Sequence, residues 1–111
     1  MLDDLILFQK TYDYFVWVFP IVARFPKQQR FVIGQEIEQE GIALLRSIVA
    51  LQHAQDKKDI LISIGVSLQM MHIYMRLAKD VRLTSIKHYS VSAEKLNELE
   101  RICAGLKKKF S

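Results

Sequence analysis

The chain is poor in the residues that cross-link or interrupt a fold. It has one cysteine, Cys103, which excludes an internal disulfide, and only two prolines and four glycines among 111 residues. Proline and glycine are the main interrupters of regular structure, so few of them leave few places for the chain to turn. Cys103 falls on an apolar helical stripe, which favours a buried, inert thiol over a nucleophile. The composition therefore predicts a packed protein with few loops.

A long hydrophobic run and a strong excess of charge are also missing. The longest apolar run, residues 15–23, is well short of the roughly 20 residues that a membrane span requires. The start carries Asp3 and Asp4 instead of the basic flank of a signal peptide. We therefore expect a cytoplasmic protein with no membrane partner. The net charge of +4 favours an anionic partner such as nucleic acid, but modest positive charge is common, so its distribution matters more.

What the chain has in abundance is apolar residues at helical spacing. Hydrophobic residues make up 50% of the sequence, which excludes disorder, and the length fits one domain over residues 1–111. Apolar positions recur every three or four residues, and no strand pattern or repeat is visible. We predict an all-α fold, an antiparallel up-down four-helix bundle. Two helices cover about 2–24 and 26–53, a third runs from an Asp56 cap to about 84, and a fourth from a Ser92 cap to 110.

The first two helices each present one stripe. In helix 2–24, which Pro20 kinks, we expect the core face to comprise Leu5, Phe8, Tyr12, Phe15, Phe19 and Val22. In the second helix, with Pro26 at its first position, the core face comprises Ile33, Ile37, Leu44, Ile48 and Leu51. Gly34 and Gly41 lie one heptad apart, which indicates either a closely approaching neighbour helix or two tolerated weak positions.

The third helix carries two apolar stripes instead of one. The first comprises Leu61, Ile64, Leu68, Met71, Met75 and Ala78. The second comprises Ile62, Val66, Met70, Ile73, Leu77 and Val81. A four-helix bundle has no central helix that buries both stripes. The second stripe therefore predicts a homo-oligomer, with scattered exposed aliphatic residues as the alternative.

The fourth helix is expected to close the bundle. Ser92 is its predicted N-cap, with Val91 and Leu96 placed as a hydrophobic staple. Its core stripe comprises Leu96, Leu99, Cys103, Leu106 and Phe110. The lysines at 107–109 lie where cations suit a helix C-terminus.

No pattern in the sequence points to a metal or a cofactor. The Glu-x-x-His motif of bundles that hold two metal ions does not occur. Glu36, Glu38 and Glu40 alternate with other residues, which spreads them around the helix. We interpret them as a solvated face and predict neither a metal site nor a cofactor.

One catalytic pattern is an alternative. Arg82 with His88, and Arg46 with His53, match the Arg-x(4–6)-His pattern of helical HEPN-type ribonucleases. The arginine would stabilise the phosphorane charge and the histidine would move a proton. Such a loose pattern arises easily by chance in a basic chain, and Leu83 follows Arg82 where that family usually has a polar residue. We therefore predict no catalytic residue and no enzyme.

Basic residues gather along one edge of the third helix and its end. They comprise His72, Arg76, Lys79, Arg82 and Lys87. A second cluster comprises Arg24, Lys27 and Arg30. Such a stripe binds phosphates without reading sequence, and its affinity falls steeply with salt. The alternative is a solvated face in which Arg76 pairs with Asp80 at i,i+4.

Three segments, taken in order, resemble one family. They are Leu-Phe-Gln-Lys-Thr-Tyr-Asp at 7–13, Phe-Pro-Lys through Gly-Gln at 25–35, and Arg-Leu-Ala-Lys-Asp at 76–80. Together they resemble the accessory variability determinant (Avd-like) four-helix-bundle proteins of diversity-generating retroelements, over nearly the whole chain. Proteins encoded in ribosomal RNA intervening sequences are related, but Arg-Phe-x-x-Gly-Gln at 30–35 is closer to the retroelement branch. A bundle of the intervening-sequence type, acting as a protein–protein adaptor, stays as an alternative.

The resemblance implies a non-catalytic protein that forms a pentameric barrel. It also implies two partners, a reverse transcriptase and nucleic acid, either RNA or DNA, during mutagenic copying of template RNA. The contact residues that the resemblance implies are Arg30, Arg46, Arg76, Lys79 and Arg82. The charge pattern adds Lys87 to this predicted set. Residues 100–106 depart from the Gly-Arg-Met-Leu-Gly-Gly-Trp-like segment that often ends the family's fourth helix.

Overall fold

The computed structural model describes residues 2–110, and it is helical almost throughout. The four long helices are α1 (Leu2–Ala23), α3 (Gln35–His53), α4 (Lys58–Asp80) and α5 (Ile86–Phe110). A short helix, α2 (Lys27–Gln29), and a π-helical turn, η1 (Arg30–Gly34), join α1 to α3. No strand is present in the described part of the chain. The prediction of an all-α protein with four helices is confirmed.

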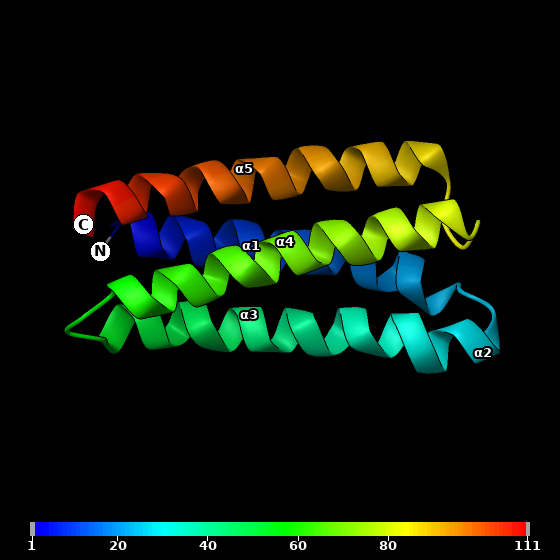
Figure 1. The fold of residues 1–111 in the computed structure, drawn as a ribbon, viewed down its shortest axis with the longest axis horizontal. Helices are drawn as coiled ribbons and strands as arrows, with labels where there is room; N and C mark the ends of the chain where they lie inside the picture. Colours follow the sequence, from blue (N-terminus) through cyan, green and yellow to red (C-terminus); the bar gives the residue numbers. More distant parts are fainter. Residues whose placement is uncertain (1, 111) are drawn as a thin grey trace.

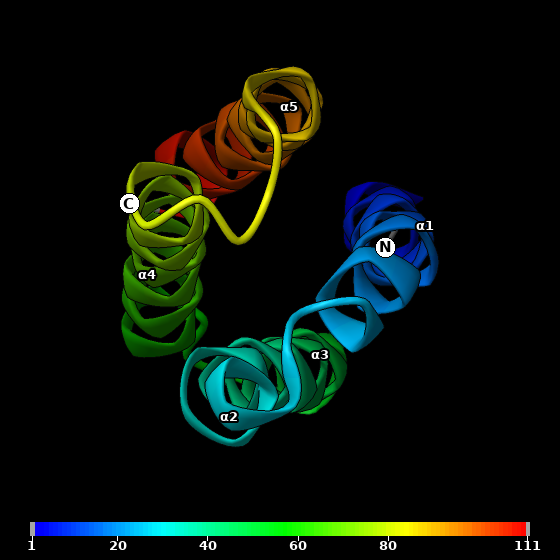
Figure 2. The same ribbon diagram turned by 90° about the vertical axis from the view of Figure 1, so that its right-hand side faces the viewer.

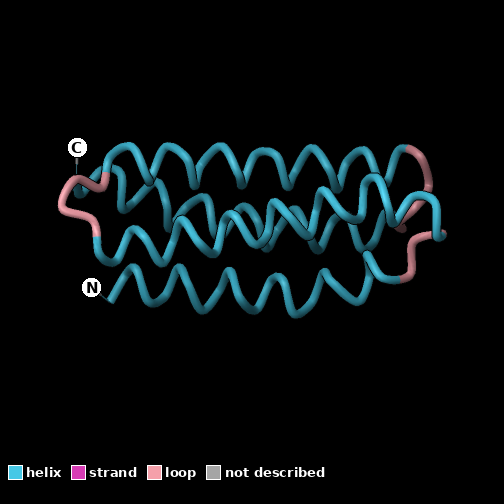
Figure 3. The backbone as a smooth tube through the Cα atoms, turned by 90° about the horizontal axis from the view of Figure 1, so that it is seen from below, coloured by secondary structure: helices cyan, strands magenta, loops and turns pink. Residues whose placement is uncertain are grey.

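The helices lie side by side in a molecule of 43 × 23 × 19 Å (Figure 1). α3 contacts α1 and α4, and α5 contacts the same two helices, so α1 and α4 lie across the bundle from each other (Figure 2). The loops lie at the two ends (Figure 3). One end holds the α3–α4 connection beside both chain termini. The other end, which we call the corner end, holds the α1–α3 corner (residues 24–34) and the α4–α5 turn (residues 81–85).

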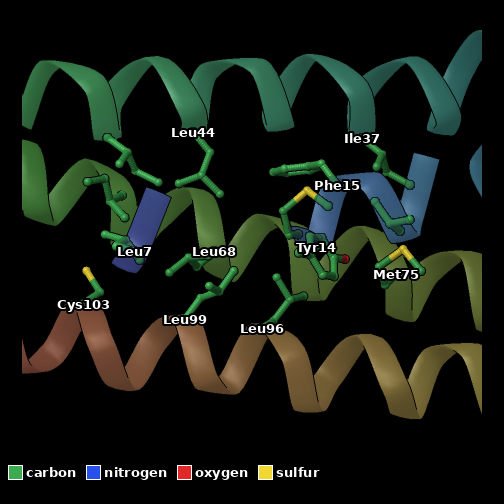
Figure 4. Packing of buried hydrophobic residues seen from close by; sticks show 14 of the residues in the cluster. Leu7, Tyr14, Phe15, Ile37, Leu44, Leu68, Met75, Leu96, Leu99 and Cys103 are labelled. Atoms are coloured by element: carbon green, nitrogen blue, oxygen red, sulfur yellow. The ribbon is translucent and has the colours of Figure 1, made fainter. Parts of the chain in front are cut away.

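The core stripes predicted for the last three long helices are confirmed, with two positions less buried than expected. Side chains from all four helices converge along the bundle axis (Figure 4). Ile33 and Phe110 are only partly buried, because each lies at an end of the bundle. Cys103 lies on the core stripe of α5, where its thiol donates to the Leu61 carbonyl at 3.7 Å. Burial raises the pKa of the Cys103 thiol, and the predicted buried position is confirmed.

The core face predicted for α1 was right only in part. Phe15 and Val22 are buried, and Phe8 and Phe19 are partly buried against the core, but Leu5 and Tyr12 are exposed. The buried face of α1 comprises Asp4, Leu7, Thr11, Tyr14, Phe15, Val18 and Val22. Asp4 and Thr11, seven positions apart, are polar residues in this buried face. A search for apolar residues at helical spacing does not select them. Leu5 and Tyr12 instead form part of a second, exposed apolar face.

Gly41 allows α1 and α3 to approach closely. A Cβ atom at Gly41 would lie 2.5 Å from Cε1 of the buried Phe15 ring. A Cβ at Gly34 would lie 3.1 Å from Cγ1 of Val22, which is tight but less severe. Of the two readings of this glycine pair, the structure supports close approach, and most clearly at Gly41.

We expect Gly41→Ala to destabilise the protein even though alanine favours helix. The Phe15 ring has little room to move, because its centroid lies 5.2 Å from the rings of both Tyr14 and Phe19. Overpacking of about 1–3 kcal/mol outweighs a gain in helix propensity of up to about 1 kcal/mol, so the free energy of unfolding in urea should fall. The matched control is Gly105→Ala, where a Cβ meets nothing within 4 Å and stability should rise by about 0.5–1 kcal/mol. The same sign for both variants would contradict the close approach.

The predicted start of the fourth helix was wrong. α5 begins at Ile86, and Ser85 caps it, because its Oγ accepts the His88 N–H at 3.0 Å. Ser92 is fully buried inside the helix, where its hydroxyl and that of Tyr14 share a hydrogen bond of 2.9 Å. The residue looked like a cap because serine often bonds to local backbone, but here a partner from α1 satisfies it.

The C-terminal end of α4 also differs from the prediction. α4 ends at Asp80, not near 84, because Arg82 takes a left-handed conformation with φ of 65°. The Leu83 and Arg82 N–H groups then donate to the carbonyls of Ala78 and Lys79, at 2.7 and 3.0 Å. This is a Schellman ending, which usually has glycine at the left-handed position, so the arginine at 82 did not indicate it.

The remaining helix starts are shifted by one position. Pro26 is the N-cap of α2, not its first helical residue. Asp56 precedes the N-cap Lys57, yet its carboxylate still accepts the Lys58 N–H at 3.1 Å. Both residues therefore mark a helix start, as predicted, although each lies one position further out.

α4 is long and apolar enough to cross a membrane by length and composition alone. Its apolar window is 33% buried inside the bundle, and core helices of soluble proteins pass the same test. The absence of a membrane partner stays a prediction.

Candidate nucleic-acid interface

The fold brings the two predicted basic clusters to the same end of the molecule. Arg24, Lys27 and Arg30 lie in the α1–α3 corner, whereas Arg82 and Lys87 lie in the α4–α5 turn and the first turn of α5. Both segments belong to the corner end (Figure 1). Arg76 and Lys79, on the last two turns of α4, extend this surface along the bundle. The sequence predicted the clusters but not that they share one end.

Arg76 and Lys79 are held near one carboxylate. The Arg76 Nε lies 3.9 Å from Asp80 Oδ2, and the Lys79 Nζ lies 3.3 Å from Asp80 Oδ1. The predicted Arg76–Asp80 pair therefore exists, but the Arg76 side chain is 72% exposed. Exposed pairs of this kind contribute little to stability, so the guanidinium can exchange this partner for a phosphate at small cost.

Lys79 is positioned more firmly than its neighbours. Its Nζ lies 4.6 Å from the centroid of the Tyr89 ring, a cation–π contact between α4 and α5. Tyr89 was not predicted as part of this surface, because no helical periodicity relates residues on two helices. The contact orients the ammonium group beside the α4–α5 turn.

A shallow groove of about 740 Å³ runs along this turn. Its lining includes Lys79, Arg82, Ser85, Ile86, Tyr89 and Ser90, together with Asp80. The N-terminus of α5 begins here, and helix N-termini favour anions. The two cations, Lys79 and Arg82, outnumber the one carboxylate, Asp80, and the helix start adds partial positive charge. The remaining positive charge suits a phosphate diester, which carries a single negative charge.

Of the other predicted basic residues, His72 and Arg46 lie away from the corner end and Arg30 lies within it. His72 is engaged elsewhere, because its Nε2 lies 2.6 Å from Glu100 Oε1 on α5. Arg30 belongs to the corner end, where its Nη1 also donates to the Ala23 carbonyl at 3.3 Å and so stabilises the last turn of α1. Arg46 is exposed on α3, three turns beyond the corner, and is not brought to this end. The contact role of every one of these residues stays a prediction.

Two residues of the ribonuclease pattern, His88 and Arg82, have structural roles. The His88 ring packs edge-on against Trp17, with centroids 6.1 Å apart at 88°. Arg82 supplies the left-handed residue that ends α4. Arg46 and His53 are both exposed on α3, with His53 as its last residue.

The glutamates of α3 are separated as expected. Glu36 and Glu38 are exposed, and Glu40 accepts a hydrogen bond of 2.9 Å from the Ser67 hydroxyl on α4. Among residues 4–110, no three His, Cys, Asp or Glu side chains are grouped to hold a metal ion. These glutamates therefore join helices or face solvent.

The second stripe of α4 lies on the surface, as the sequence predicted. Its exposed members are Ile62, Val66, Ile73, Leu77 and Val81, and Met70 is partly buried. Residues 60–75 of α4 contain no Asp, Glu, Lys or Arg. An uncharged apolar strip along a surface helix is typical of a protein–protein interface.

Comparison with known proteins identifies the family. The model of the bAvd-like family matches residues 5–110. No curated protein and no solved structure matches the chain. The three segments that suggested this resemblance lie on α1, at the α1–α3 corner and at the end of α4. Because the match covers nearly all of the sequence, the chain belongs to the bAvd-like family.

Proposed function

We propose that this protein is a non-catalytic, cytoplasmic accessory factor of a diversity-generating retroelement. It binds RNA or DNA through phosphate contacts at the corner end and acts together with a reverse transcriptase. The family membership supports the retroelement role. The observation that carries the nucleic-acid role is that both basic clusters lie at one end of the bundle.

The charge distribution supports contacts to phosphate. Arg24, Lys27, Arg82 and Lys87 are exposed in segments that meet at the corner end, and acidic residues there are fewer. Several cations on one surface bind a polyanion by releasing its counterions, which needs no particular sequence. The reverse transcriptase as partner rests on the family resemblance.

We also propose that antiparallel bundles associate into a pentameric ring through the exposed stripe of α4. A closed ring of five requires a heterologous contact, so this face must meet a different face of the next subunit. α1 lies across the bundle from α4 and presents Leu5, Tyr12 and Val16 to solvent. An interface between the α4 and α1 faces uses both exposed apolar surfaces.

Filter binding of a structured RNA across a salt series tests the nucleic-acid role. We expect tight binding at low salt and a logarithmic loss of affinity with salt of about 0.7–0.9 per phosphate contact. Undetectable binding at low salt would overturn this role. Electrophoresis of the recovered RNA tests the absence of catalysis, since cleavage that His88→Ala abolishes would favour the ribonuclease alternative.

A further inference from the structure

The corner end exposes an aromatic ring on its π-helical turn. Arg30, Phe31 and Val32 are three consecutive exposed residues, with Phe31 63% and Val32 65% accessible. They lie in η1, where the Gln35 N–H donates to the Arg30 carbonyl, five residues back. The π turn inserts one extra residue into the helix, and such insertions are frequent at functional sites. Three consecutive apolar residues, Phe31 to Ile33, indicate an exposed apolar side chain, because one face of a helix cannot bury all three.

A hollow of about 330 Å³ lies beside this ring. It is lined by Ala23, Arg30, Phe31, Gln35 and Glu38, which come from the end of α1, from η1 and from the first turn of α3. The volume lies at the lower end of the range for small-molecule sites. The hollow therefore combines an aromatic face with a cation, an amide and a carboxylate.

We propose that the hollow binds one unstacked base of a single-stranded nucleic acid. This inference rests on the proposed function and specifies its ligand as single-stranded. The base stacks on Phe31, and its edge faces Gln35 and Glu38. A carboxylate accepts hydrogen bonds from the exocyclic amino groups of cytosine, adenine and guanine, so Glu38 favours these bases over thymine and uracil, which lack that group. Arg24 and Lys27, exposed in the same corner, contact the flanking phosphates.

The surroundings of the ring favour a nucleic acid over a second copy of the chain. An aromatic side chain among cations is the combination that binds single strands, because every base has a π-face and every linkage a charge. Lysine is depleted in protein–protein interfaces, whereas Lys27 is exposed beside this site. A duplex would leave the hollow empty, since its bases remain stacked and paired.

Fluorescence anisotropy with two labelled DNA oligomers tests the proposal. One is an oligocytidine and the other is an abasic strand with the same number of phosphates. We expect the full-length protein to bind the oligocytidine more tightly. Phe31→Ala should weaken oligocytidine binding about five- to hundredfold and leave abasic binding unchanged. Phe31→Trp should retain binding, and the matched control Val32→Ala should behave like the parent protein.

The outcomes separate this proposal from the one on which it rests. Equal affinity of the parent protein for both strands would overturn the base site and leave phosphate binding intact. Binding of neither strand would overturn both proposals. If Phe31→Ala weakened both strands equally and also changed the sedimentation coefficient, the ring would belong to a contact between copies of the chain.

Discussion

Replacing Lys57 by alanine is expected to lower the free energy of unfolding by about 3–5 kcal/mol, the usual cost of breaking a buried ion pair. The Lys57 Nζ lies 3.8 Å from Oδ2 of Asp4, whose side chain is 1% exposed. Neither carboxylate oxygen of Asp4 has a hydrogen-bond partner among the described residues, so Lys57 is the compensating charge that the structure provides. Its removal leaves a carboxylate in the core without a cation.

The same lysine connects three parts of the bundle. Its ammonium group also donates to the Leu51 carbonyl at the end of α3 and lies 5.7 Å from the centroid of the Phe110 ring on α5. Lys57 therefore holds α1, α3 and α5 together at the end that carries the chain termini. Its loss should loosen the end opposite to the corner end.

Urea unfolding followed by circular dichroism measures the cost, with Lys58→Ala as the matched control. Lys58 is exposed, so its removal should change stability by no more than about 0.5 kcal/mol. In the double variant Asp4→Leu/Lys57→Met, which removes both charges, most of the stability should return. Equal, small losses for Lys57→Ala and Lys58→Ala would show that the pair contributes nothing.

If the proposed ring forms, Ile73→Asp should disperse it into monomers of about the chain mass of 13.0 kDa. Ile73 is 54% exposed in the uncharged strip of α4, so an aspartate there faces water in the monomer. In the assembly the same charge would be buried without a partner, which opposes association. Sedimentation velocity measures the mass, and circular dichroism should report unchanged helicity. The matched control is Ile42→Asp on α3. Ile42 is 55% exposed, and this variant should keep the mass of the parent protein.

A mixing experiment tests the heterologous contact between α4 and α1. Val16→Asp should also disperse the ring, because Val16 lies on the exposed face of α1. Mixed with Ile73→Asp, it should form heterodimers, since one protein keeps an intact α4 face and the other an intact α1 face. An absence of heterodimers would contradict this pairing of faces, and a monomeric parent protein would contradict self-association altogether.

The sequence was sufficient to predict the helices and most of the core. Apolar residues at helical spacing identified all four segments, and the buried stripes of α3, α4 and α5 follow it. The pattern failed on α1, because Asp4 and Thr11 occupy core positions, and at Ser92, because its partner is the distant Tyr14. Both failures arise from tertiary contacts that no local pattern contains.

The candidate site was predictable only in part. The basic residues of each cluster were visible in the sequence, but their meeting at the corner end depends on how the helices pack. The π turn that carries Phe31 and the contact of Lys79 with Tyr89 were not predicted. Local spacing determines which residues share one helix face, whereas the site is formed by several elements.

The most direct test of the account compares two triple variants of equal charge in the RNA salt series. Arg76→Gln/Lys79→Gln/Arg82→Gln neutralises the basic surface near the corner end, and Lys107→Gln/Lys108→Gln/Lys109→Gln neutralises the opposite end (Figure 1). Each lowers the net charge by three, from +4 to +1. Only the first variant should lose affinity and salt dependence, and its salt slope should be smaller by about 0.7–0.9 for each contact removed. Equal losses in both variants would contradict this expectation, because the binding would then follow net charge and not the surface at the corner end.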